Sequence, residues 1–170
     1  NIGLIAPALA VEDIVMTRDP RMLDKIKKAT GRDKIQPVTL MGGSTWNHPL
    51  TPESCDRYCE EAVFVDAYYP DNPDTAVRDF VSAFRQSVGA DPVLSDAQAY
   101  DTAALLRSVL KGASPSRRDA LREALLALPG VKGVTGTLKF ANNGEAIKQL
   151  FVLTIEDRAI QLWKTKRPEG

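Results

Sequence analysis

The hydrophobic positions of this chain follow a helical period over much of its length. Between residues 3 and 30, and again between 73 and 128, apolar side chains recur every three or four residues with polar positions between them. That spacing places the apolar side chains on one face of a helix. The sequence therefore predicts amphipathic helices over residues 3–14, 21–30, 51–60, 73–88, 95–111 and 115–128.

Short apolar runs of a different kind predict strands. PVTLM (37–41) and AVFV (62–65) are continuous apolar runs and are typical of buried parallel strands. After residue 131 the chain instead has short apolar segments separated by turn residues. These predict strands over 137–140, 150–155 and 159–163. Helices and strands in this order indicate an α/β protein.

The three helices between 73 and 128 follow one another without a strand between them. Each has a wide apolar stripe, and in the helix 95–111 we expect the inward face to contain Ala99, Ala103, Leu106 and Leu110. The two predicted buried strands belong with the earlier helices. The three helices therefore either form a bundle or cover a sheet built from sequence outside these 170 residues, and we favour the second interpretation.

Composition and charge narrow the class of function. The 22 basic and 22 acidic residues are well mixed, so the net charge is zero and no basic field could hold nucleic acid. No apolar run approaches the roughly 18 residues that a membrane span requires. The first residues, NIGLIAPALAVEDIV, lack the basic start of a secretion signal, and we expect the chain to be a piece of a longer one.

Motifs that indicate catalysis or metal binding are missing from the sequence. It has no P-loop, GxGxxG, HExxH or GxSxG motif. Cys55 and Cys59 are expected as unpaired thiols in one short helix, because side chains one turn apart are badly placed for a disulfide. A zinc site would need two further ligands, and His48 is the only histidine. We therefore predict no enzyme, no metal and no cofactor.

The loop GGSTWN, which follows the first predicted buried strand, is the main candidate site. Ligands bind at the carboxyl ends of strands in open α/β sheets. The hydroxyls, amide, indole and backbone N–H groups of this loop suit a small zwitterion, and its candidate residues are Ser44, Thr45, Trp46 and Asn47. The alternative is an ordinary turn whose Trp46 packs on the core.

Two tyrosines are further candidates for ligand contacts. Tyr68 lies, with Tyr69, in an exposed aromatic-proline turn where one body of the protein is expected to end and another to begin. Its ring could stack on a ligand or its hydroxyl could hydrogen-bond to one, and packing at a hinge is an equal alternative. Tyr100, beside Asp101, faces the same ligand in one interpretation and is structural in the other.

Several motifs, taken in order, resemble a known family. They are VTLMGGSTW, the crossover VFVDAYYPDNPD, the tripeptide AYD at 99–101, and GVTGTLKF followed by Asn143 and Gly144. The chain is similar to the C-terminal portion of type I periplasmic binding proteins, in particular the branched-chain amino-acid-binding and extracellular ligand-binding receptor group. The match covers roughly residues 36–163, and about half of a usual receptor is absent.

The resemblance implies a partial α/β fold with two lobes joined by crossover segments. Residues 1–66 would form part of lobe two, 67–130 the helices of lobe one, and 131–170 strands returning to lobe two. It also implies that ligand lies in the cleft between the lobes, with contacts at Ser44, Thr45 and Trp46. The segment from Met16 to Gln36 is longer and more basic than this family leads us to expect.

The function implied by the resemblance is that of a solute-binding receptor domain. It would capture an amino acid or similar small ligand in the periplasm or another extracytoplasmic space, by lobe closure, and deliver it to the membrane permease of an ABC transporter. The full-length protein could be lipid-anchored. Alternatives with the same fold are a lipoprotein that acts on a protein partner in the cell envelope, such as a penicillin-binding protein activator, and a sensory domain. An enzyme using Asp66 or His48 is the least favoured.

Overall fold

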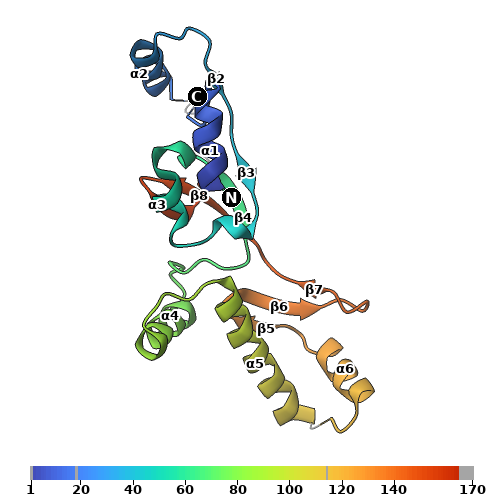
Figure 1. Cartoon of the computed structure of the whole chain (residues 1–170). Helices are drawn as coiled ribbons and strands as arrows, with labels where there is room; N and C mark the ends of the chain where they lie inside the picture. Colours follow the sequence, from blue (N-terminus) through green and yellow to red (C-terminus); the bar gives the residue numbers. More distant parts are fainter. Residues whose placement is uncertain (1, 18, 114, 165–170) are drawn as a thin grey trace. The chain divides into compact units, whose positions relative to one another are not determined.

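The computed structural model describes residues 2–17, 19–113 and 115–164 of an α/β chain that divides into two compact units. Unit 1 contains the chain up to Asp66 and the chain from Val152 onward, and unit 2 contains Ala67–Phe151. The chain therefore passes from one unit to the other twice. Figure 1 labels helices and strands of both units.

Unit 1 is built around a four-stranded sheet with the strand order β3-β4-β8-β9, in which β3 pairs in parallel with β4 and β8 pairs antiparallel with β9. Two further short strands, β1 and β2, pair in parallel. The strands are β1 (Ile14–Val15), β2 (Gln36–Pro37), β3 (Met41–Gly42), β4 (Val63–Asp66), β8 (Phe151–Glu156) and β9 (Ala159–Leu162). The helices are α1 (Ile2–Val11), α2 (Pro20–Thr30) and α3 (Thr51–Cys55), with 3-10 helices η1 (Ser44–Trp46) and η2 (Asp56–Cys59).

The core of unit 1 lies where α1 meets α3 and η2. α1 buries Ile2 and Ala6, while α3 and η2 contribute Cys55 and Cys59. In the sheet, three successive residues of β8 are buried, and they include Leu153 and Ile155. Successive residues of a strand point to opposite faces, so β8 is covered on both faces.

The helix expected over 21–30 is confirmed, and the structure shows a cap at each of its ends. The Asp19 side chain accepts a hydrogen bond from the Arg21 backbone at 2.9 Å, and Pro20 occupies the first helical position. Gly31 ends the helix at φ 67, with its N–H donating to the Lys27 carbonyl. None of the residues of α2 is buried, so this helix packs only loosely on the described part of unit 1.

The two cysteines form a disulfide, so the expectation of unpaired thiols is wrong. The error came from assuming one continuous helix. α3 stops at Cys55, and Asp56 adopts φ 47 and ψ −142, a conformation that side-chain-bearing residues rarely hold and that costs on the order of 1–3 kcal/mol. The Cα atoms of Cys55 and Cys59 lie 5.8 Å apart, within the usual disulfide range of about 4.4–6.8 Å.

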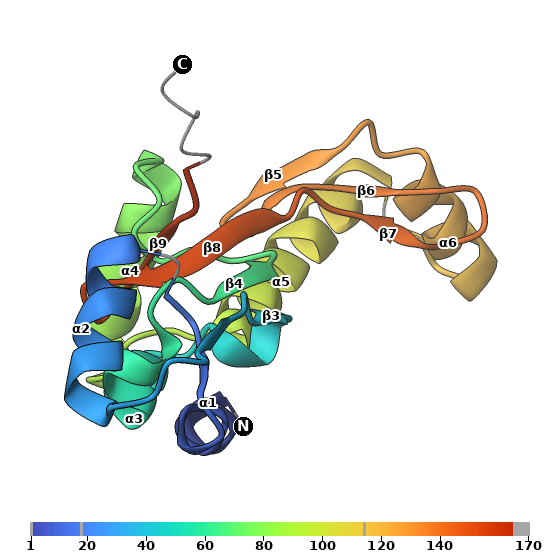
Figure 2. The ribbon, with the colours of Figure 1, turned by 90° about the horizontal axis from the view of Figure 1, so that it is seen from above.

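Unit 2 combines three helices with a small antiparallel sheet. Its helices are α4 (Thr75–Val88), α5 (Leu94–Ala113) and α6 (Arg118–Leu126), and its strands are β5 (Val131–Gly133), β6 (Gly136–Phe140) and β7 (Ala146–Ile147), in the order β5-β6-β7. α5 contacts β5 and α6 contacts β6, and Figures 1 and 2 show the strands running alongside these helices. Unit 2 extends as far as Phe151. The assignment of the units to particular lobes remains a prediction.

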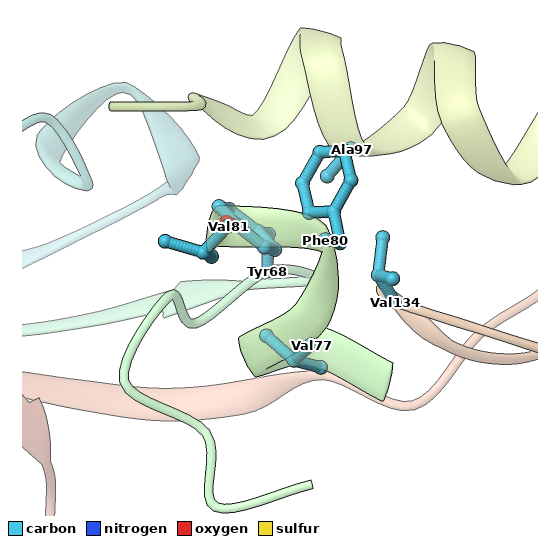
Figure 3. Close-up of a cluster of buried hydrophobic side chains, with 6 residues drawn as sticks. All are labelled: Tyr68, Val77, Phe80, Val81, Ala97 and Val134. Carbon is cyan, nitrogen blue, oxygen red and sulfur yellow. The ribbon is translucent and has the colours of Figure 1, made fainter. Parts of the chain in front are cut away.

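The hydrophobic core of unit 2 joins the crossover to the helices and the hairpin, as Figure 3 shows. α4 buries three apolar side chains, and its first turn is capped by the Asp74 carboxylate, which accepts from the Ala76 backbone at 3.0 Å. Phe84 packs on the edge of the cluster. The buried members are Tyr68, Val77, Phe80, Val81, Ala97 and Val134.

The inward face expected for α5 is wrong. Ala99, Ala103, Leu106 and Leu110 are all exposed. The buried positions are instead Ala97, Asp101, Leu105 and Val109, one helical turn apart from each other.

A buried carboxylate is the reason for this rotation of α5. Asp101 is only 4% exposed. Its oxygens accept hydrogen bonds from the backbone N–H of Val134 at 2.7 Å, from that of Thr135 at 2.9 Å, and from the Thr135 hydroxyl at 2.5 Å. Three donors at the β5–β6 turn thus replace the water that the carboxylate loses, and hold the polar position of the helix inward.

Gly133 is required by this arrangement, which gives a test. A Cβ at Gly133 would overlap the Asp101 carboxylate, whereas a Cβ at Gly112 would meet nothing within 4 Å. We expect Gly133→Ala to lower the free energy of unfolding by about 1–3 kcal/mol, as overpacking does. Gly112→Ala, the matched control in the same unit, should leave it unchanged or raise it by up to about 1 kcal/mol, since alanine favours a helix. Urea denaturation measures both, and equal midpoints would contradict the role of Asp101.

Candidate functional site

The candidate loop lies where two parallel strands of unit 1 end. Gly42 of β3 pairs with Phe64 of β4, so the carboxyl ends of both strands meet at one edge of the sheet. The loop follows β3 directly as the 3-10 helix η1 and ends at Asn47. The Asn47 side-chain amide donates to the Asp66 carboxylate at 2.7 Å, and Asp66 is the last residue of β4. One side-chain hydrogen bond therefore ties the loop of one strand to the end of the next.

Asp66 lies at the candidate site, although the sequence analysis named it only as a least-favoured catalytic residue and not as a ligand-binding one. It is 1% exposed and lies beside the loop, although its sequence neighbourhood suggested only a turn acid. The parallel pairing of the two predicted strands was the signal that could have found it, because parallel strands bring their carboxyl ends together.

The loop is held in shape by its own backbone and by Trp46. The Trp46 N–H donates to the Gly43 carbonyl at 3.1 Å, and the Asn47 N–H donates to the Ser44 carbonyl at 3.0 Å. The indole is partly buried, with its ring 6.2 Å from that of Phe64 in an edge-to-face arrangement. Trp46 therefore does pack on the core, as the alternative interpretation proposed, while part of its surface stays accessible.

The accessible chemistry of this loop is polar with one aromatic surface. The Ser44 and Thr45 side chains are exposed, and the Trp46 ring lies next to them in sequence. Hydroxyls can donate to a carboxylate or accept from an ammonium group, and an indole offers an apolar face. Within the described ranges, no group of three or more His, Cys, Asp or Glu side chains is arranged to hold a metal ion.

The predicted tyrosines belong to unit 2. Tyr68 is 1% exposed, lies in the core cluster, and has its ring edge-to-face with Phe80 at 6.4 Å. Burial raises the pKa of Tyr68 well above the ordinary value, so its hydroxyl is neutral at physiological pH. Tyr100 is 52% exposed and stacks against the same Phe80 at 4.8 Å. Tyr69 packs on Phe151 at 6.3 Å.

The structure thus gathers Ser44, Thr45, Trp46 and Asn47 with Asp66 in unit 1, and joins Tyr68 to Tyr100 through Phe80 in unit 2. His48 is exposed, and its ring nitrogen accepts from the Leu50 backbone at 3.2 Å, so it serves the local turn.

Two open hollows lie elsewhere in the described chain. One of about 350 Å³ in unit 1 is lined by residues 12–13 and 34–37. The other, of about 280 Å³ in unit 2, contains an ion pair between Asp74 and Lys132 at 2.6 Å. A hydrogen bond from Lys132 holds the pKa of Asp74 below its usual value. Neither hollow contains a predicted site residue.

A protein-family comparison agrees with this fold. Residues 15–159 match the family described as periplasmic binding protein, which is most of the chain, and the chain belongs to that family. Members of this family are typically binding proteins rather than enzymes. None of the curated proteins compared with the chain matches it significantly. Among the residues that the structure describes, no helix is both long enough and apolar enough to cross a membrane.

Solved structures show the same fold over part of their length. A protein from Rhodospirillum rubrum, named as a candidate branched-chain amino acid ABC transporter, is 27% identical, has a TM-score of 0.67, and is matched over 80% of this chain and 39% of its own. The leucine binding protein LivK of Thermotoga maritima is 17% identical, with a TM-score of 0.62 over 96% of this chain and 48% of its own. A solute binding protein of an R. palustris ABC transporter, solved with benzoate, is 15% identical, with a TM-score of 0.64 over 95% and 46%. The chain thus spans less than half the length of each.

A pair of glycine substitutions tests the loop geometry. A Cβ at Gly42 would lie 2.5–2.6 Å from three atoms of the Trp46 ring, whereas a Cβ at Gly43 would meet nothing within 4 Å. In a Trp163→Phe background, where Trp46 is the remaining tryptophan, Gly42→Ala should change the near-UV circular dichroism and lower stability by about 1–3 kcal/mol. Gly43→Ala should do neither. A Gly42→Ala spectrum identical to that of the parent would show that Trp46 does not rest on β3.

Proposed function

We propose that this chain is the ligand-binding part of a solute-binding receptor that captures an amino acid or a similar small organic acid for uptake by an ABC-type transporter. The observation that carries the proposal is the position of the Ser44–Asn47 loop. It lies, with exposed hydroxyls and an accessible indole, at the carboxyl ends of two paired parallel strands. Membership of the periplasmic binding protein family supports the same conclusion.

Ligand recognition would divide between polar and apolar contacts. The Ser44 and Thr45 hydroxyls would bind the carboxylate of the ligand, and the Trp46 ring would cover its apolar part. Asn47, held by Asp66, would keep the loop in position. The amino-acid and benzoate ligands named for similar proteins share a carboxylate and an apolar group, which is the combination that this loop suits.

The unit 2 tyrosines have different parts in the proposal. Tyr100, with its exposed ring, is proposed as a ligand contact. Tyr68 is also proposed as a ligand contact. Its ring lies in the core cluster, so this contact would require a local rearrangement. Capture would occur by lobe closure, with a membrane permease as the receiving partner, in the periplasm or another extracytoplasmic space and with a lipid anchor in the full-length protein.

A tryptophan substitution tests the proposed site. In the full-length protein, Trp46→Ala should weaken binding of a carboxylate ligand by about tenfold or more, because a partly buried aromatic contact is lost. Trp163→Ala is the matched control, since Trp163 is exposed beyond the end of β9. Isothermal titration calorimetry against amino acids and aromatic acids measures both affinities, and circular dichroism checks that the fold is kept. An unchanged affinity for Trp46→Ala would remove the loop from the site.

A second candidate is an interaction module of the same fold that acts on a protein partner in the cell envelope. The outer face of α5 favours it, because Ala99, Tyr100, Ala103 and Leu106 are all exposed there. A thermal-shift screen of the full-length protein with amino acids and aromatic acids separates the candidates. A rise in melting temperature with any of these solutes supports the receptor, and no shift with any of them supports the interaction module.

A further inference from the structure

The disulfide of unit 1 lies at the base of a clamp on the C-terminal hairpin. Cys55 and Cys59 are 1% and 0% exposed, and the short segment between them packs against α1. One residue inside the disulfide loop and the residue that follows the loop make polar contacts with the turn that joins β8 to β9.

Two acidic side chains form the clamp. Asp56, inside the disulfide loop, makes an ion pair with Arg158. Glu60, the residue after Cys59, accepts hydrogen bonds at its two carboxylate oxygens, from the backbone N–H of Asp157 at 3.0 Å and from that of Arg158 at 2.9 Å.

The hairpin turn needs this support because of its residues. β8 ends at Glu156 and β9 begins at Ala159, so Asp157 and Arg158 form a two-residue turn. Both have positive φ, 52 and 60 respectively, as the type I′ turn requires. Such turns normally use glycine or asparagine, because other side chains are strained there. The Glu60 carboxylate offsets that cost by accepting from both backbone N–H groups.

The position of Glu60 depends in turn on an unusual residue that the disulfide spans. Asp56 holds φ 47 and ψ −142, and such a conformation persists only where the surroundings impose it. The Cys55–Cys59 bond begins one residue before Asp56 and ends one residue before Glu60. It therefore limits how far either acidic side chain can move.

We propose that the Cys55–Cys59 disulfide is a redox-controlled lock on the β8–β9 hairpin. With the disulfide formed, Asp56 and Glu60 hold the turn. A dithiol reductant converts the disulfide into two thiols, with two electrons and two protons passing from the dithiol, which itself becomes a disulfide. Asp56 then relaxes to an ordinary backbone conformation, Glu60 withdraws, and the turn loses its acceptor.

The lock would act on the sheet that carries the candidate loop, although it does not depend on any ligand. After Glu60, the Glu61 N–H donates to the Ile155 carbonyl at 2.8 Å, and the Ile155 N–H donates to the Ala62 carbonyl at 3.3 Å. Opening of the clamp thus begins beside β8, which lies next to β4 in the sheet.

Both sulfurs are buried, so a reductant reaches them only when this segment opens. The disulfide is therefore expected to stay formed in an oxidising compartment.

Hydrogen exchange of the 170-residue chain with and without dithiothreitol tests the lock. Alkylation followed by mass spectrometry confirms the redox state of each sample. We expect the amides of Asp157 and Arg158 to exchange about tenfold faster after reduction, because their charged acceptor is lost. The β5–β6 hairpin of unit 2 should keep its exchange rates and so report that the chain remains folded. Unchanged exchange at the turn, or an equal increase over the β1–β2 pair, would overturn the proposal.

Two variants separate the clamp from the disulfide. Glu60→Ala should give fast exchange at Asp157 and Arg158 even in the oxidised chain, whereas Glu53→Ala, which removes an exposed acid from α3, should not. Cys55→Ser/Cys59→Ser should exchange like the reduced chain and should no longer respond to dithiothreitol. Slow exchange at the turn in Glu60→Ala, or a remaining response in the double serine variant, would contradict the lock.

Discussion

A buried aspartate side chain organises contacts in each of the two units. A carboxyl group leaves water only where hydrogen-bond donors replace the solvent, so the position of such a group dictates what lies around it. In unit 2, Asp101 accepts from three donors at the β5–β6 turn and leaves room for no side chain at Gly133. In unit 1, Asp66 accepts from Asn47 and so fixes the loop that follows β3.

The same constraint bears on the function proposed for the loop of unit 1. A binding loop must present its polar groups in a defined geometry, since disorder would add an entropic cost to every contact it makes. Here the loop is braced on one side by the Asn47–Asp66 hydrogen bond and on the other by the packing of Trp46 on Phe64. Ser44 and Thr45 are the residues left exposed between these supports. The structural and functional interpretations of Trp46 are therefore compatible, because the ring packs on Gly42 and Phe64 and still leaves part of its surface accessible.

Unit 1 also shows how one backbone irregularity can control distant contacts. The helix that begins at Thr51 ends at Cys55 because Asp56 leaves the helical region. The disulfide spans this break, and Asp56 within it and Glu60 just after it hold the β8–β9 turn. Asp157 and Arg158, about a hundred positions away in the chain, keep their unfavourable turn conformation through the Glu60 carboxylate.

The sequence by itself determined the kind and order of most elements. Period and turn chemistry predicted α2, α4, the strand before Asp66 and the C-terminal hairpin, and the order of the motifs indicated the family. The candidate loop was found in the same way, because strand ends can be read locally.

Tertiary structure alone decided three things. The burial of Asp101 turned α5 away from its most apolar face, since three hydrogen bonds from the β5–β6 turn outweighed the hydrophobic pattern. Parallel pairing brought Asp66 to the loop, and the conformation of Asp56 joined Cys55 to Cys59. Each depends on contacts that form only in the folded chain, and the local pattern of hydrophobic residues does not indicate such contacts.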